Sequence, residues 1–145
     1  MSTSVKIITE SVICELSDAG ITESSDRTTS ESLGQLTKTD TGFSLSYDEQ
    51  IGEEGSEPTS TEIIYSSNAI LLKRRGAVKC DFEFREGEGF TTLYTVTPYS
   101  FDTGIYTRRI RGALSENGGV VSILYDMEIG GAKKNVRMKL TVSPI

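Results

Sequence analysis

The stretch VVSILYDMEIGGAKKNVRMKLTV (residues 120–142) decides the fold class, because apolar and polar side chains alternate along it on both sides of a glycine turn. An alternation with period two is typical of a β-strand with one buried face. The pair Gly130–Gly131 supplies the backbone freedom that a tight turn between two strands needs. The stretch therefore predicts a β-hairpin. The side chains expected on its buried face are Val121, Ile123, Tyr125, Met127, Ile129, Val136, Met138, Leu140 and Val142.

The same alternation recurs along the rest of the chain. In GFSLSYDEQI (42–51), Phe43, Leu45, Tyr47, Glu49 and Ile51 share one face. Turn signals rich in Gly, Asn, Asp and Ser separate such runs about every ten residues, and no eleven-residue window has a helical stripe. We expect strands at 3–16, 29–38, 41–51, 60–66, 69–75, 78–86, 90–98, 103–114, 119–129 and 133–143. The polar segment 21–32 is expected to be a long loop or a ragged strand.

Many short strands with short connections indicate an all-β barrel or sandwich. We favour one antiparallel up-and-down barrel of about 8–10 strands over residues 1–145, because a closed meander leaves no unpaired edge. A β-sandwich is the alternative. Whether the first 40 residues complete the barrel stays open.

The composition excludes several chemistries. The chain has 145 residues and no histidine, which removes Ser-His-Asp and Cys-His catalysis and His-based metal sites. We expect no catalytic residue set, no metal and no cofactor. The net charge of -6 argues against nucleic acid as a partner. It is uneven, with -10 over residues 1–62 and +4 over residues 63–145. We expect the two halves to complement each other within the barrel, although a charged interaction surface is the alternative.

The two cysteines and the N-terminal residues bear on location. Cys14 and Cys80 do not form a disulfide framework, and we expect both to be small core residues. No apolar run approaches the length of a membrane span, and we expect neither a signal peptide nor a membrane partner. These features favour a cytoplasmic protein.

One segment, LYTVTPYSFDTGIYTRR (93–109), is distinctive. In the order of the motifs, this chain resembles the YwiB-like family, a calycin-like barrel family of unknown function found mostly in Gram-positive bacteria. The residues that carry the resemblance are Tyr47, Glu49, Lys73, Arg74, Gly76, Leu93, Tyr94, Thr97, Pro98, Tyr99, the run 104–109, Gly119, Leu124, Tyr125 and Asn135. The match covers about residues 40–145 and departs from the family at Ser100, where the family usually has Gly. It implies a barrel akin to lipocalins and fatty-acid-binding proteins, and it implies no activity.

Two charged residues are predicted to face the barrel interior. Glu49 shares a face with Leu45 and Tyr47, and Arg74 shares one with Ile70 and Leu72. A buried charge without a partner costs several kcal/mol, so we expect Glu49 and Arg74 to pair. The candidate ligand-binding residues inside the barrel are Tyr47, Glu49, Arg74, Tyr94 and Thr107. The alternative is an internal ion pair with no ligand, or strand ends that let both side chains reach water.

Charged segments outside this cluster are expected to be solvated. Arg108, Arg109 and Arg111 form one basic segment, and Lys133, Lys134 and Arg137 form another. We expect an outer face with cross-strand pairs to Asp126 and Glu128, and an anion-binding patch is the alternative. The loop 52–58 is read as a solvated acidic loop rather than a calcium site.

These observations leave three classes of function. The first is a non-enzymatic barrel that binds a small hydrophobic or anionic molecule. The second is an interaction domain with a filled interior that acts on a protein partner through its surface. An enzyme based on carboxylates or tyrosines ranks third, because no pattern of residues supports it.

Overall fold

The computed structural model describes residues 2–49, 58–67 and 69–145. All of its regular structure is β, which confirms the all-β prediction. The ten strands are β1 (Ser2–Leu16), β2 (Thr22–Lys38), β3 (Gly42–Glu49), β4 (Thr59–Ser66), β5 (Ala69–Arg75), β6 (Val78–Phe84), β7 (Gly89–Val96), β8 (Tyr99–Ser115), β9 (Gly118–Ile129) and β10 (Ala132–Pro144). Within the described ranges, no helix is long and apolar enough to cross a membrane.

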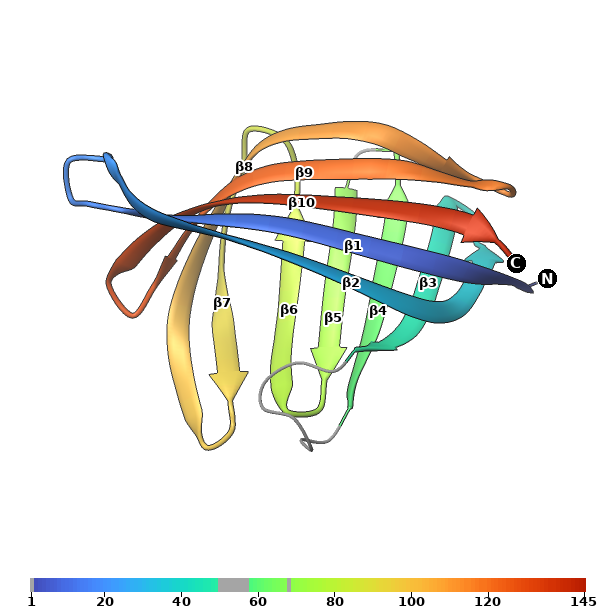
Figure 1. Ribbon diagram of the computed structural model, residues 1–145, viewed down its shortest axis with the longest axis horizontal. Coiled ribbons are helices and arrows are strands. Elements are labelled where there is room, and N and C mark those ends of the chain that lie inside the picture. The colour runs from blue at the N-terminus through green and yellow to red at the C-terminus, as the bar shows by residue number, and fades with distance from the viewer. Residues whose placement is uncertain (1, 50–57, 68) are drawn as a thin grey trace.

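The strands form one closed antiparallel barrel in which each strand lies beside its neighbours in sequence (Figure 1). The barrel prediction is confirmed, and the sandwich alternative is wrong. β1 pairs with both β2 and β10, so the first 40 residues complete the barrel and close it. The last two strands meet at Gly130 and Gly131, whose φ values of 54° and 86° provide the predicted glycine turn.

The wall of the barrel is uneven. On one side, β2, β1, β10, β9 and β8 are 12 to 17 residues long and pair along most of their length. On the other side, the strands β3 to β7 have seven or eight residues. The shortest ladder joins β6 to β7 through the three pairs Val78–Val96, Lys79–Thr95 and Cys80–Tyr94.

The alternation predicted from the sequence correctly identifies the core. In β9 and β10, the members of the predicted inner face from Val121 to Tyr125 and from Val136 to Val142 are at most 6% exposed. Met127 is partly buried against the same core, and Ile129 is also partly buried. In β3, Leu45 and Tyr47 are buried and Phe43 packs against them, whereas Ile51 lies outside the described residues.

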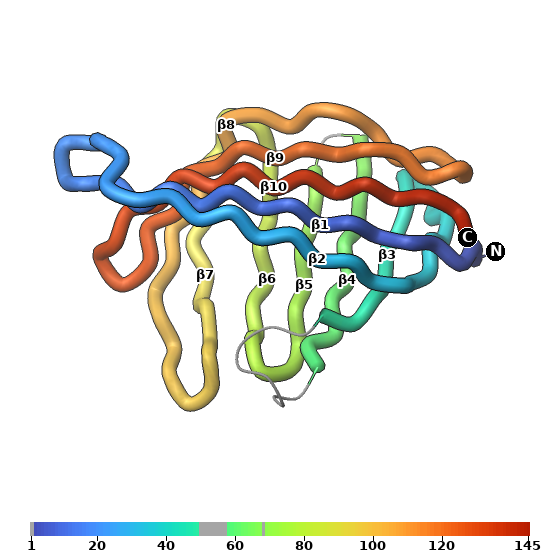
Figure 2. The backbone as a smooth tube through the Cα atoms, in the orientation of Figure 1, coloured from blue at the N-terminus to red at the C-terminus, as the bar shows by residue number. Residues whose placement is uncertain are grey.

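Residues 22–28 form a strand rather than a loop. They belong to β2, which pairs with β1 from Thr22 to Thr37. Figure 2 shows this end of the β1–β2 hairpin projecting beyond the barrel. Its side chains are exposed on both faces, so the segment carries no apolar alternation for a sequence-based prediction to detect.

The two cysteines lie in different environments. Cys80 is buried at 3% exposure on the inner face of β6, as predicted. The prediction for Cys14 was wrong, because this residue is half-buried on β1. It lies at an even position of β1, where side chains point outward. Its register partners on the neighbouring strands are Asn135 on β10 and Ser25 on β2. Both thiols are free.

Candidate binding site at one end of the barrel

A row of polar side chains crosses the inner wall near one end of the barrel. The strand registers place Tyr47, Thr61, Arg74, Cys80 and Tyr94 directly opposite one another on β3, β4, β5, β6 and β7. The next inner position of β3 toward this end is Glu49, which lies opposite Thr59 on β4. Three neighbouring strands therefore change from apolar to polar side chains at the same depth.

Glu49 and Arg74 form an ion pair at this depth. Arg74 Nη2 lies 3.4 Å from Glu49 Oε1, and the two side chains are 17% and 10% exposed. Thr61, on the strand between them, donates a hydrogen bond from Oγ1 to the same carboxylate oxygen at 2.8 Å. The structure therefore brings together the two charges that the sequence placed inside the barrel, and each has a partner.

Tyr47 completes the cluster on the β3 side. Burial is the main cause that raises the pKa of its phenol, and the negative charge of Glu49 raises it further. The hydroxyl lies within hydrogen-bonding reach of Thr9 and Glu49. Tyr47 is therefore a neutral hydroxyl that can donate a hydrogen bond across the physiological pH range.

Burial favours the neutral forms of three further side chains, Tyr125, Tyr94 and Cys80. Burial raises the pKa of Tyr125 on β9 to about 12, even though the positive charge of Arg74 acts in the opposite direction. Burial likewise raises the pKa values of Tyr94 and of the Cys80 thiol. Arg74 influences all three groups, so its charge acts across the interior as far as Tyr125.

Two buried polar atoms in the interior have no hydrogen-bond partner within the described residues. They are Nε of Arg74 and Oγ1 of Thr107. Thr107 is fully buried on β8, directly opposite Tyr125. Since most buried polar groups in proteins are hydrogen-bonded, a buried guanidinium N–H and a hydroxyl without partners need an explanation.

Apolar side chains fill the barrel beyond the polar row. Phe82 stacks on Tyr94 with ring centroids 5.9 Å apart, and Phe84 packs on Tyr125 at 4.8 Å. None of five hollows of 330 to 730 Å³ in the described part of the chain is lined by Glu49, Arg74, Tyr94 or Thr107. These aromatic side chains pack beside the polar row, and the five hollows lie away from the Glu49–Arg74 pair on the described chain.

An apolar surface adjoins the polar row at this end. Phe101 lies opposite Tyr94, and Tyr99 lies opposite Val96, so these four side chains share one face of the β7–β8 hairpin. Val96, Tyr99 and Phe101 are 41%, 68% and 38% exposed. The inner face of the hairpin thus continues outward from the polar row as an exposed apolar strip.

Of the five predicted binding residues, the structure places Tyr47, Glu49, Arg74 and Tyr94 on neighbouring strands at this end, and it places Thr107 farther along β8, opposite Tyr125. Tyr47, Glu49, Arg74, Tyr94 and Thr107 all have buried or half-buried side chains, and their role in binding stays a prediction. Thr61 and the exposed pair Tyr99 and Phe101 were not identified. The alternation of Thr59, Thr61 and Ile63 in β4 was a signal for Thr61, whereas cross-strand register, which one sequence does not provide, was needed for Phe101.

The outer charged segments are partly paired, as expected. Arg108 donates from Nε to Asp126 Oδ2 at 2.6 Å, and Asn135 donates to the other oxygen of the same carboxylate at 2.9 Å. The acidic loop 52–58 lies outside the described residues apart from Pro58. No group of three or more Cys, Asp or Glu side chains in the described ranges is placed to hold a metal ion.

Comparison with known families agrees with this geometry. The family model described as "Domain of unknown function (DUF1934)" matches residues 14–141, from β1 to β10. The chain belongs to this family. A comparison with curated proteins gave no match.

A solved structure of the YwiB protein from Bacillus subtilis has the same fold. It is 25% identical in sequence and superposes with a TM-score of 0.83, covering 99% of this chain and 93% of that chain. The YwiB-like resemblance of the sequence motifs is therefore confirmed. Because this family has no assigned function, the comparison establishes the fold and leaves the function to be argued from the residues.

Proposed function

We propose that the polar end of the barrel binds a small molecule that presents a carbonyl or carboxylate oxygen to Arg74 and carries an apolar body. The observation that carries this proposal is the buried Arg74 Nε, which has no hydrogen-bond partner within the described residues. Thr107 Oγ1, farther along β8, is a second such atom. A bound oxygen atom would satisfy the N–H of Arg74, and the Thr107 hydroxyl can donate or accept as required.

The ion pair with Glu49 leaves Arg74 suitable for this role. Glu49 Oε1 contacts Nη2, so the Nε–H is still available as a donor. The positive charge is already balanced, which favours a neutral carbonyl at least as much as a second carboxylate. The apolar body would lie on the exposed strip of Val96, Tyr99 and Phe101 rather than deep in the packed core.

The test uses octanoate and octanamide, which share an apolar chain and differ in the charge of the polar end. Binding would be measured by isothermal titration and by the rise in melting temperature with ligand concentration. Arg74→Lys keeps the charge and removes the guanidinium fork, and Thr107→Val removes the second orphan atom. Arg75→Lys is the matched control, because Arg75 is the next residue on β5 and pairs with Asp81 on the outside.

Saturable binding that falls at least tenfold in Arg74→Lys and in Thr107→Val, but not in Arg75→Lys, would support the proposal. The absence of binding for both probes, or equal losses in all three variants, would contradict it. Thr107→Val keeps the test usable even if Arg74→Lys does not fold.

The close burial of core side chains favours a second candidate function, an interaction domain that acts through its outer surface. The tight burial of Phe84, Leu45 and Ile123 supports it, because a filled barrel presents its chemistry outside. The two functions concern different faces of the wall and do not exclude each other.

A further inference from the structure

A groove of about 330 Å³ runs across the outer face of the long-stranded side of the barrel. Five cationic side chains from three strands line it, and Glu10 is the one acid among its lining residues in the described chain. The cations are Arg27 on β2, Arg109 and Arg111 on β8, and Arg137 and Lys139 on β10. Each of these five side chains is exposed.

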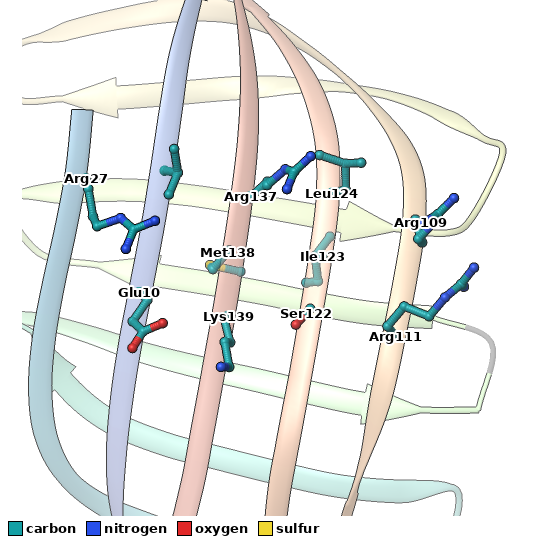
Figure 3. Close-up of a pocket in the computed structure, with 11 residues that line it drawn as sticks. Glu10, Arg27, Arg109, Arg111, Ser122, Ile123, Leu124, Arg137, Met138 and Lys139 are labelled. Carbon is teal, nitrogen blue, oxygen red and sulfur yellow. The ribbon is translucent and has the colours of Figure 1, made fainter. Parts of the chain in front are cut away.

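The register orders these side chains into two rows across the strands (Figure 3). The first row runs from Arg27 through Val12, Arg137 and Leu124 to Arg109, so arginines alternate with aliphatic residues. Strands lie about 4.8 Å apart, which places successive arginines of this row about 10 Å from each other at their backbones. The second row consists of Glu10, Lys139, Ser122 and Arg111.

The arginines of the first row lack ion-pair partners. Elsewhere in the described residues, every arginine pairs with a carboxylate, as Arg75 does with Asp81 and Arg108 with Asp126. Arg27, Arg109 and Arg137 form no such pair with the described residues. Arg111 is bound by Glu86 at 3.1 Å at the edge of the groove. The unpaired guanidinium groups are thus concentrated in one place.

The chemistry of the lining residues favours phosphate. Guanidinium groups bind phosphate oxygens through two parallel hydrogen bonds, and several of them around one groove suit a ligand with more than one phosphate. Val12 and Leu124 are half-buried between the arginines and offer an apolar surface to an organic moiety. The volume suits a small molecule. A long polyanion would be repelled by a chain of net charge -6.

We propose that this outer groove binds a small soluble molecule with two or more linked phosphates, held by Arg27, Arg109 and Arg137 and contacting Val12 and Leu124 with its organic part. This site lies on the opposite face of the wall from the Arg74 cluster and is independent of the function proposed for that cluster. It assigns a role to the basic residues of β8 and β10 that strand pairing does not account for.

The experiment titrates the purified chain with inorganic tripolyphosphate and with adenosine triphosphate, without added metal, by isothermal titration at 20 mM and 150 mM NaCl. The variants are Arg137→Gln and the double variant Arg109→Gln/Arg137→Gln. The controls are Arg108→Gln and Arg75→Gln, whose side chains pair with Asp126 and Asp81 outside the groove. Circular dichroism would verify that each variant is folded.

We expect saturable binding of both probes, tighter at the lower salt concentration because exposed charges are screened less there. Arg137→Gln should weaken it at least fivefold and the double variant at least twentyfold, with less than twofold change in either control. The proposal would be overturned by no saturable binding at 1 mM, by equal losses in Arg108→Gln, or by preferential binding of polyglutamate or a single-stranded oligonucleotide over both phosphates.

Discussion

Thr107 and Tyr125 are direct cross-strand partners inside the barrel, and Thr107 contributes a fully buried hydroxyl that hydrogen-bonds to nothing in the described chain. Tyr125 is 6% exposed and packs its ring on Phe84, so the space around the hydroxyl is closed from that side. An unsatisfied hydroxyl in such a place costs free energy of folding, which evolution can remove by a substitution to valine.

Thr107→Val should therefore raise the free energy of unfolding by about 1 kcal/mol, because valine has the same shape and removes the unsatisfied group. The measurement is the midpoint of urea unfolding at constant m-value. Thr61→Val is the matched control, since its hydroxyl bonds to Glu49 and its loss should lower stability by about 1.5 kcal/mol or more. A fall in stability for Thr107→Val would show that the hydroxyl already has a partner.

The Glu49–Arg74 pair should be strongly coupled. Arg74→Met should lower the free energy of unfolding by about 3 kcal/mol, because it leaves a half-buried carboxylate without its cation. The double variant Glu49→Gln/Arg74→Met should recover much of this loss. A double-mutant cycle by urea unfolding gives the coupling free energy, and additive single effects would mean that the two side chains act independently.

Alkaline pH should destabilise the barrel through its buried tyrosines. The pKa of Tyr125 is raised from 10.0 to about 12, so between these values the unfolded chain loses a proton that the folded chain keeps. The stabilising contribution is complete below pH 10 and is lost as the pH rises toward 12, at about 1.4 kcal/mol per pH unit. Tyr47 and Tyr94 are shifted in the same direction.

Absorbance of tyrosinate at 295 nm provides the check. At pH 11, Tyr125→Phe should leave the absorbance of the folded protein nearly unchanged and lower that of the protein unfolded in urea. An equal decrease in both states would mean that Tyr125 titrates normally in the barrel.

Gly112 should be intolerant of any side chain. Its φ is +87°, and an added Cβ would lie 2.0 Å from the carbonyl oxygen of Val120 on the neighbouring strand. Gly131 has nearly the same φ, +86°, but open space around it. Gly131→Ala should therefore cost about 1 kcal/mol from the left-handed backbone alone, and Gly112→Ala should cost at least twice as much, by urea unfolding. Equal losses of unfolding free energy in the two variants would mean that the β8–β9 strands move apart to accommodate the added side chain at Gly112.

The sequence could predict the inner face of each strand, because alternation is a local property that burial imposes on every strand of the closed sheet. It therefore placed Glu49 and Arg74 inside, and the energetic cost of a buried charge predicted that they meet. Residues 22–28 could not be assigned in this way, since the β1–β2 hairpin leaves the barrel there and neither face is buried.

The outer groove could not be predicted from the sequence, for a different reason. Arg27, Arg109 and Arg137 are separated by at least 28 residues along the chain, and the barrel register alone brings them into one row. The sequence did show that Arg109 and Arg111 are two residues apart, as are Arg137 and Lys139. This spacing places both members of each pair on the same face of a strand. It therefore indicated cations on the outer face of each strand. It did not indicate that β2, β8 and β10 bring them into one groove.

The three-pair ladder between β6 and β7 gives the barrel a seam. Residues 81–84 of β6 pair with β5 but have no register partner on β7, whereas β1 and β10 are joined by twelve consecutive pairs. Local opening draws on the least stabilised hydrogen bonds, so amide hydrogen exchange should be fastest along this seam and slowest where β1 meets β10. Phe82 and Tyr94 stack at the seam, beside Arg74 in the inner row. Local opening at this seam would uncover the polar cluster from the side, while the twelve pairs between β1 and β10 keep the ring closed.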